Sequence, residues 1–277
     1  MTLPVIMHIN YCEQGQSLAE ACAKAVKWGF DGVEFRRRRA GDTDPVQYLD
    51  ELARAVERSG LKQVIFGSPG PDLMTTDAGV RARELEEAER FFRLAAERFR
   101  LTVCNTFSGS LVNPNRDPAR PAYDQNGSAC ATPDQWAQAT DGFKQLGAVA
   151  GELGFRLAFE THMNYLHDTP AAARALVDRI DHPAVGINLD YGNAVYFQKP
   201  QTLDAALTTA GERTYYVHLK NSIRVGAGAR VPVGLADGEI NHRAYLRRLR
   251  EIGYAGPIGI EAPRPGDREA FAQADLA

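Results

Sequence analysis

The chain has few cysteines and no paired cysteine motif. Its 277 residues contain only Cys12, Cys22, Cys104 and Cys130, and no two of them form a C-x-x-C pair. Disulfide frameworks are typical of short secreted chains. We therefore expect reduced thiols and a cytoplasmic protein. The apolar neighbours of Cys104 favour a small core residue at that position.

Long apolar runs and an excess of positive charge are also absent. No run of about 18 apolar residues occurs, so no membrane span is predicted. Lys and Arg number 32 against 35 Asp and Glu, giving a net charge of -3. This balance does not favour binding to nucleic acid or to a membrane surface. The chain begins with a strand-like run and no charged leader, so no signal peptide is expected.

A glycine-rich phosphate loop is missing after the first expected strand. The sequence there is Asn10-Tyr11-Cys12-Glu13-Gln14-Gly15, which argues against a doubly wound dinucleotide-binding sheet. Strand-like and helix-like segments alternate along the whole chain, and its length suits a barrel of roughly 250 residues. The predicted fold is therefore α/β, a single (β/α)8 TIM-barrel domain spanning residues 1–277.

Local patterns place the elements of this barrel. Strands are expected at 5–10, 32–35, 63–66, 101–107, 155–162, 185–190, 214–220 and 257–261. Ser17, Thr132 and Thr169 are expected to cap helices. The long segment 108–133 follows a strand, so we expect it to act as a lid on the catalytic face. The polar residues 265–277 are expected to be only partly ordered.

Four expected strands end in side chains that can bind a metal ion: Glu160, Asp190, His218 and Glu261. A TIM barrel presents its catalytic residues at these strand ends, and a buried carboxylate is unfavourable unless it is paired or bound to a cation. Any one of the four could instead cap the next helix, but together they predict one metal site. Three carboxylates and one imidazole suit Mn²⁺ or Mg²⁺, with Co²⁺ or Zn²⁺ as alternatives.

These motifs resemble the xylose isomerase-like TIM-barrel superfamily, in its sugar isomerase/epimerase branch. The matching stretches are Gly32-Val33-Glu34, Glu160-Thr161-His162, Asp190-Tyr191-Gly192-Asn193, His218-Leu219-Lys220, Gly238-Glu239-Ile240-Asn241 and Gly253-Tyr254 through Ile260-Glu261. The resemblance implies that Glu160, Asp190, His218 and Glu261 hold the metal. It further implies that Glu160 and Glu261 are catalytic acid/base groups on opposite faces of the substrate.

Four more residues are candidates for substrate binding: His162, Lys220, Glu34 and Arg36. His162 would share the side of Glu160 if the strand continues, or would support the ligands by a hydrogen bond. Lys220 could polarise a carbonyl or bind an anionic group, or form a salt bridge with a neighbouring carboxylate. Glu34 could line the pocket or form a structural ion pair. Arg36 begins a four-arginine run that could attract phosphate or carboxylate, or lie in solvent.

The predicted function is a divalent-metal-dependent isomerase or epimerase of a small sugar or keto-sugar. It would abstract a proton next to a metal-bound carbonyl. A lyase, either a dehydratase or a β-eliminase of a keto-sugar or cyclic polyol ketone, would use the same site, and the sequence does not choose between them. DNA-repair endonucleases of the same superfamily use three zinc ions and many His ligands, whereas this chain has six His and no positive excess.

The expected partner is a small-molecule carbohydrate, with neither nucleic acid nor a membrane. The sequence leaves the formation of a homo-oligomer open. A barrel that only binds a ligand, without catalysis, would require the four metal ligands to be accidental.

Overall fold

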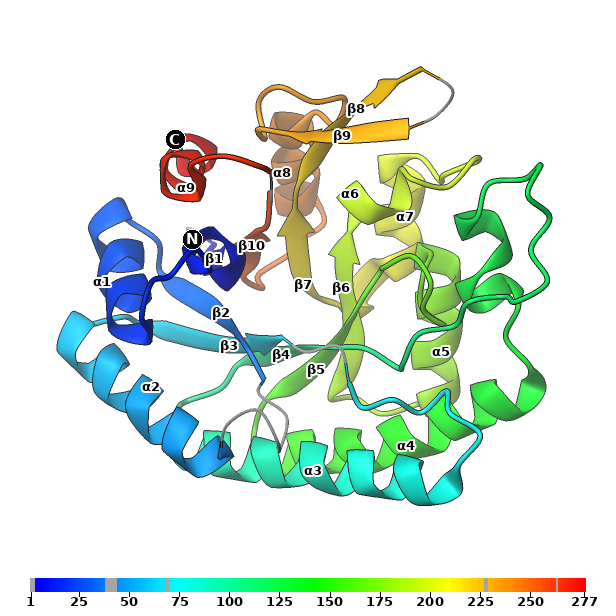
Figure 1. Ribbon diagram of the computed structural model, residues 1–277, viewed down its shortest axis with the longest axis horizontal. Coiled ribbons are helices and arrows are strands. Elements are labelled where there is room, and N and C mark those ends of the chain that lie inside the picture. The colour runs from blue at the N-terminus through cyan, green and yellow to red at the C-terminus, as the bar shows by residue number, and fades with distance from the viewer. Residues whose placement is uncertain (1–2, 38–43, 68–69, 227–228, 263) are drawn as a thin grey trace.

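Eight parallel strands close into a barrel in the computed structural model, which describes residues 3–37, 44–67, 70–226, 229–262 and 264–277 (Figure 1). The barrel strands are β1 (Val5–His8), β2 (Gly32–Arg36), β3 (Gln63–Gly67), β4 (Val103–Thr106), β5 (Arg156–Glu160), β6 (Val185–Asp190), β7 (Thr214–Leu219) and β10 (Ile258–Ile260). Around the barrel their order is β1-β10-β7-β6-β5-β4-β3-β2. The predicted TIM-barrel fold is confirmed.

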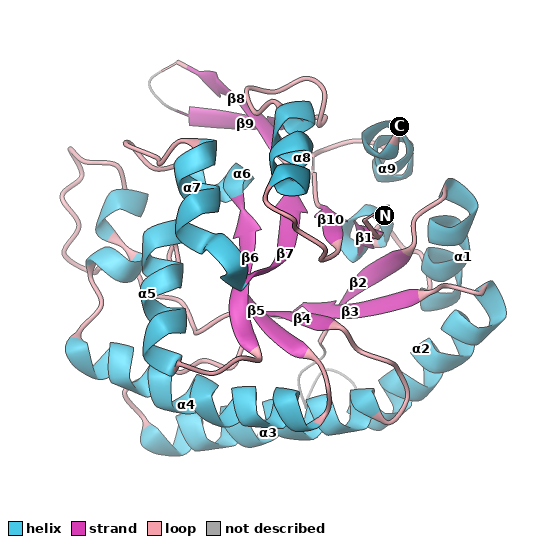
Figure 2. Ribbon diagram, turned by 180° about the vertical axis from the view of Figure 1, so that it is seen from behind, coloured by secondary structure: helices cyan, strands magenta, loops and turns pink. Residues whose placement is uncertain are grey.

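Helices follow the strands and lie outside the barrel (Figure 2). They are α1 (Leu18–Trp28), α2 (Pro45–Ser59), α3 (Ala78–Ala96), α4 (Pro133–Glu152), α5 (Pro170–Ile180), α6 (Tyr191–Ala194), α7 (Leu203–Ala210), α8 (His242–Glu251) and α9 (Arg268–Leu276). Ser17 and Thr132 cap α1 and α4 with full capping boxes, and Thr169 caps α5, as predicted. Among these helices, none combines the length and apolar character needed to cross a bilayer.

One apolar layer fills the interior of the barrel. It is formed by buried side chains of alternate strands, β1, β3, β5 and β7, with one contact from β4. The residues are Ile6, Ile65, Ala158, Tyr216 and Val103. A second, larger apolar cluster fills the space between strands and helices. Within it, the ring of Phe143 on α4 meets that of Phe159 on β5 edge-on, with centroids 4.5 Å apart.

Closer to the carboxyl ends of the strands, the interior of the barrel becomes polar. Asn105 of β4 donates a hydrogen bond to Glu34 of β2, and Asn188 of β6 donates one to Asn105. The matching position on β10 is Gly259, where an added Cβ would lie 2.8 Å from the ring of His218. The absent side chain leaves room for that ring, so the polar layer forms the floor of the predicted site.

Two segments differ from expectation near the catalytic face. Strand β5 ends at Glu160 and does not continue to His162. After β7 the chain forms an antiparallel hairpin of β8 (Asn221–Val225) and β9 (Ala229–Val233), which was not predicted.

The C-terminal residues are ordered, contrary to expectation. Helix α9 buries Ala272, and Asp275 near its end accepts hydrogen bonds from Tyr11 and Arg264. These long-range contacts fix the helix against the loops that follow β1 and β10. The expected partial order of 265–277 is therefore wrong.

Candidate active site

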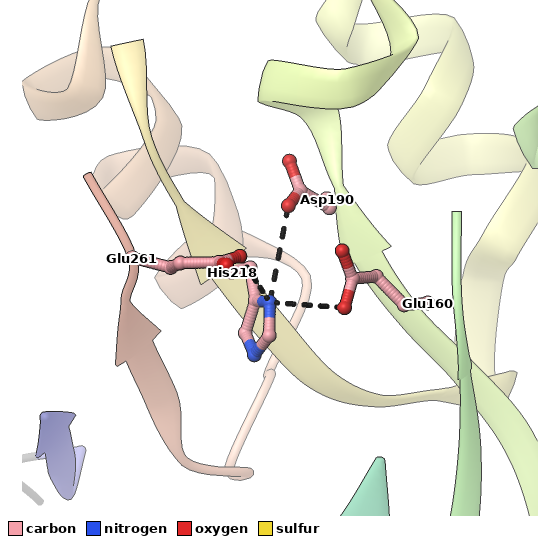
Figure 3. A group of neighbouring side chains, drawn as sticks. All are labelled: Glu160, Asp190, His218 and Glu261. Carbon is pink, nitrogen blue, oxygen red and sulfur yellow. Dashed lines mark ion pairs between the residues drawn. The ribbon is translucent and has the colours of Figure 1, made fainter. Parts of the chain in front are cut away.

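The four predicted ligand side chains converge at the carboxyl end of the barrel (Figure 3). Each offers one atom, and these four atoms all lie within 4.8 Å of one another. His218 Nδ1 lies 3.3 Å from Glu261 Oε2, 3.5 Å from Glu160 Oε2 and 3.8 Å from Asp190 Oδ2. Glu160, Asp190 and His218 are buried, while the side chain of Glu261 keeps 16% of its surface exposed.

The donor atoms of this cluster fit a divalent cation. His218 Nδ1 and Asp190 Oδ2 are buried, and neither makes a hydrogen bond of regular geometry within the described part of the chain, although buried polar atoms normally do. Three carboxylates and one imidazole form the mostly oxygen-based set that Mn²⁺ and Mg²⁺ accept. Glu160, Asp190, His218 and Glu261 could therefore hold such an ion.

The carboxylate of Glu34 fixes the orientation of the His218 ring by a contact with its Nε2 atom. This fully buried carboxylate accepts hydrogen bonds from His218 Nε2 at 2.7 Å, Tyr216 Oη at 2.8 Å and Asn105 Nδ2 at 3.1 Å. Burial alone would raise the pKa of Glu34, but the His218 imidazole lowers it to about 2. Since Nε2 donates to Glu34, Nδ1 of His218 faces the other carboxylates, as a metal ligand must.

Two amide side chains that the sequence analysis missed orient Glu160. Asn105 Nδ2 donates to Glu160 Oε2 at 2.8 Å, and Asn193 Nδ2 donates to Glu160 Oε1 at 2.9 Å. Asn193 is held in turn, because its backbone N–H donates to Asp190 Oδ1 at 2.9 Å. Asp190 thus caps the short helix α6 with one oxygen and leaves the other for the cluster. The sequence pointed to Asn193 only through its place in the stretch Asp190-Tyr191-Gly192-Asn193, which resembles the family.

Lys220 lies at the edge of the same cluster. Its ammonium is 2.8 Å from Asp190 Oδ2, 3.0 Å from Glu261 Oε2 and 3.8 Å from Glu160 Oε1. The sequence left open whether Lys220 binds substrate or forms a salt bridge. The structure shows the salt bridge to neighbouring carboxylates. Although burial alone would raise the pKa of Glu261, Lys220 and His8 hold it well below its usual range.

The structure places His162 and Arg36 apart from these contacts. His162 follows the end of β5 and packs edge-on against the rings of Phe107 and Tyr165. The condition for its sharing the side of Glu160, a continuing strand, is not met. Arg36 pairs with Glu13 at the end of β2 and lines a cavity of about 320 Å³. Arg38 and Arg39 of the arginine run lie outside the described residues.

His167 is a further buried residue that sequence reasoning missed. Its Nε2 accepts a hydrogen bond from the Ser108 N–H at 3.2 Å, so Nδ1 carries the proton and donates to the Glu160 carbonyl at 2.5 Å. Burial lowers the pKa of His167 to about 3, which keeps the ring neutral. The ring therefore ties the start of the long 108–133 segment to the end of β5.

The chain is thus of the class of parallel α/β barrels that carry a cluster of carboxylates and an imidazole at the strand ends. Within that class, a family model described as xylose isomerase-like TIM barrel matches residues 22–277, and the chain belongs to this family.

Three known proteins illustrate the relationship. A 2-oxo-tetronate isomerase of Haemophilus influenzae is 29% identical over 255 residues, which are 90% of this chain and 87% of that protein. An inosose dehydratase of Clostridium perfringens is 26% identical over 147 residues, 47% of this chain and 48% of that protein. The crystal structure of a Methylomonas D-allulose 3-epimerase with D-allulose has a TM-score of 0.75 at 17% identity, covering 99% of this chain and 95% of that one. The comparisons support an enzyme of the sugar isomerase/epimerase type.

Proposed function

We propose that the protein is a divalent-metal-dependent isomerase or epimerase of a small keto-sugar. The observation that carries this proposal is the convergence of Glu160, Asp190, His218 and Glu261 from four strand ends onto one point. These four side chains would hold Mn²⁺ or Mg²⁺. Such an ion, when bound, polarises a substrate carbonyl and so acidifies the neighbouring C–H.

In this proposal Glu160 and Glu261 move the proton. Glu160 is held in one orientation by amide donors on both oxygens. Glu261 approaches from the other side of the barrel, after β10, and its lowered pKa keeps it in the ionised form that a base requires. One glutamate removes the proton from the carbon next to the carbonyl. The other glutamate returns a proton to the adjacent carbon in an isomerisation, or to the opposite face of the same carbon in an epimerisation.

The remaining predicted residues take different roles in this proposal. Glu34 positions His218 and does not contact the substrate, because its carboxylate is fully buried and hydrogen-bonded on both oxygens. Lys220 would bind a substrate oxygen beside the ligands, which is supported by the position of its ammonium against Asp190 and Glu261. His162 and Arg36 stay predictions as substrate-binding residues.

The named isomerase relative supports a short 2-oxo sugar acid or related keto-sugar as the carbohydrate partner. The dehydratase relative favours a second candidate, elimination of water by the same site. The four cysteines are free, which agrees with the reducing cytoplasm proposed from the sequence.

The test is a screen of ketoses, inososes and 2-oxo sugar acids in D₂O with added Mn²⁺ or Mg²⁺. Deuterium uptake without loss of water supports isomerisation or epimerisation, whereas loss of water supports the lyase. Glu160→Gln and Glu261→Gln should each reduce kcat by about 10²–10⁴-fold, the range for a lost acid/base group. Glu152→Gln, which changes an exposed glutamate paired with Arg93, is the control. Full activity of either site variant after metal removal would rule the mechanism out.

A further inference from the structure

We propose that Lys220 is a built-in cation that holds the carboxylates of the metal site together before the ion binds, and that it competes with the ion for them. This inference rests on the metal site of the proposed function. It concerns a residue that is not itself one of the four ligands.

The position of the Lys220 ammonium is the first argument. It contacts carboxylates at the ends of three different strands, with distances of 2.8 Å to Asp190, 3.0 Å to Glu261 and 3.8 Å to Glu160. The distance of 2.8 Å between Lys220 Nζ and Asp190 Oδ2 is that of a direct contact between opposite charges. The ammonium therefore lies against the oxygens that a bound ion would need.

The path of the Lys220 side chain is the second argument. An added Cβ at Gly192 would lie 2.4 Å from Lys220 Cγ and 2.9 Å from the Lys220 carbonyl oxygen. Gly192 belongs to α6 and lies two residues after the proposed ligand Asp190. The absent side chain at Gly192 leaves room for the lysine stem, and only 16% of the Lys220 side chain is exposed.

The balance of charge gives the third argument. The His218 ring faces four carboxylates, with Glu34 at Nε2 and Glu160, Asp190 and Glu261 at Nδ1. One imidazole cannot compensate that many negative charges. Like charges this close repel, and a group that contacts three of the four opposes the repulsion.

An ion held by Asp190 and Glu261 would add a second positive charge at the atoms that Lys220 contacts. Two cations repel each other at such a distance, so binding of the ion must weaken or break at least one contact of the ammonium. Lys220 should therefore have opposite effects on the two states of the site. It stabilises the metal-free protein and lowers the affinity for the ion.

The experiment uses the full chain, freed of metal with EDTA, and Mn²⁺ as the probe. Lys220→Met removes the charge and keeps the stem. The matched control is Lys62→Met, because Lys62 also pairs with an aspartate, Asp31, but is 76% exposed on the surface. The two measurements are the Kd for Mn²⁺ by calorimetry and the Tm with and without Mn²⁺.

We expect Lys220→Met to lower the metal-free Tm by roughly 3 °C or more and to tighten Mn²⁺ binding about tenfold. Lys62→Met should change neither quantity by a comparable amount. Mn²⁺ affinity of Lys220→Met that is equal to or weaker than that of the wild type would overturn the inference.

If the metal-free variant does not fold, the rate at which EDTA removes Mn²⁺ from the loaded protein decides. Slower release than from the wild type supports competition, and equal or faster release contradicts it. Binding to Lys220→Met but not to the wild type would be the extreme case in favour. Absence of binding to both would refute the metal site as well, whereas equal binding to both would refute only the role of Lys220.

Discussion

Replacing Glu34 by Gln should weaken metal binding although no ligand is changed. The carboxylate of Glu34 only accepts hydrogen bonds: Oε2 accepts from His218 and Tyr216, and Oε1 accepts from Asn105. A glutamine of the same shape must place its NH₂ group against one of these donors. In either orientation two donors meet, and the negative charge beside His218 is lost.

The size of the effect follows from these contacts. A carboxylate that orients a metal-binding histidine typically contributes 10–100-fold to metal affinity, which is about 1.4–2.7 kcal/mol. We expect the upper part of this range for Glu34→Gln, because the disturbance also reaches Glu160. Asn105 Nδ2 donates to both glutamates, and its Oδ1 accepts from Asn188, so rotating the Asn105 amide creates a new clash.

Calorimetric titration of the metal-free protein with Mn²⁺ tests this prediction. The Kd of Glu34→Gln should rise at least about tenfold relative to the wild type, whereas Glu152→Gln on the surface should leave it unchanged. A Kd of the Glu34 variant within about a factor of two of the wild type would refute the reasoning. Circular dichroism of the variant separates loss of the site from loss of the fold.

Two further predictions concern stability. Burial raises the pKa of Asp168 to about 7 despite hydrogen bonds from Ser128, so the folded state binds a proton more tightly than the unfolded one. As the pH rises from 5 to 8, the free energy of unfolding of the wild type should therefore fall by up to about 3 kcal/mol relative to that of Asp168→Asn. Urea unfolding of both proteins at both pH values measures this difference. A difference that does not change with pH would contradict the prediction. Phe143→Ala should lower the free energy of unfolding, measured in the same way, by about 3–5 kcal/mol, because the fully buried ring packs against Phe159. A loss below about 1 kcal/mol would show that this contact between α4 and β5 contributes little to stability.

The four ligand residues could be predicted because their signal is local. Each comes at the end of a short apolar run, and a parallel barrel brings all such ends to one face. Once the barrel was predicted, Glu160, Asp190, His218 and Glu261 had to lie near one another. The structure confirms the barrel and the proximity of the four side chains, while their roles remain proposals.

The supporting residues could not be predicted because their partners are distant in the chain. Asn105 serves Glu34 and Glu160, which are 71 and 55 positions away. An asparagine at the end of a strand is equally typical of a turn or a helix cap. Lys220 gave the same difficulty, since a lysine beside carboxylates can bind substrate or form a salt bridge.

The other errors have similar causes. Residues 222–225 and 229–231 do alternate in polarity, but a barrel strand is normally followed by a helix, so the β8–β9 hairpin was not expected. Helix α9 has a polar composition, and its attachment depends on the buried Asp275, whose partners Tyr11 and Arg264 could not be identified from the sequence.

The two proposed acid/base residues are held by different kinds of contact, and this difference separates their behaviour. Both oxygens of Glu160 accept hydrogen bonds from neutral amides, which fix its orientation without compensating its charge. Glu261 is fixed mainly by the ammonium of Lys220, with a longer hydrogen bond of 3.5 Å from Asn10 on its other oxygen. If the ion displaces Lys220, Glu160 loses a contact of 3.8 Å but keeps both amide hydrogen bonds, whereas Glu261 loses its contact of 3.0 Å. Glu160 would then keep its orientation in both states of the site, whereas the contacts of Glu261 would depend on whether the ion is bound.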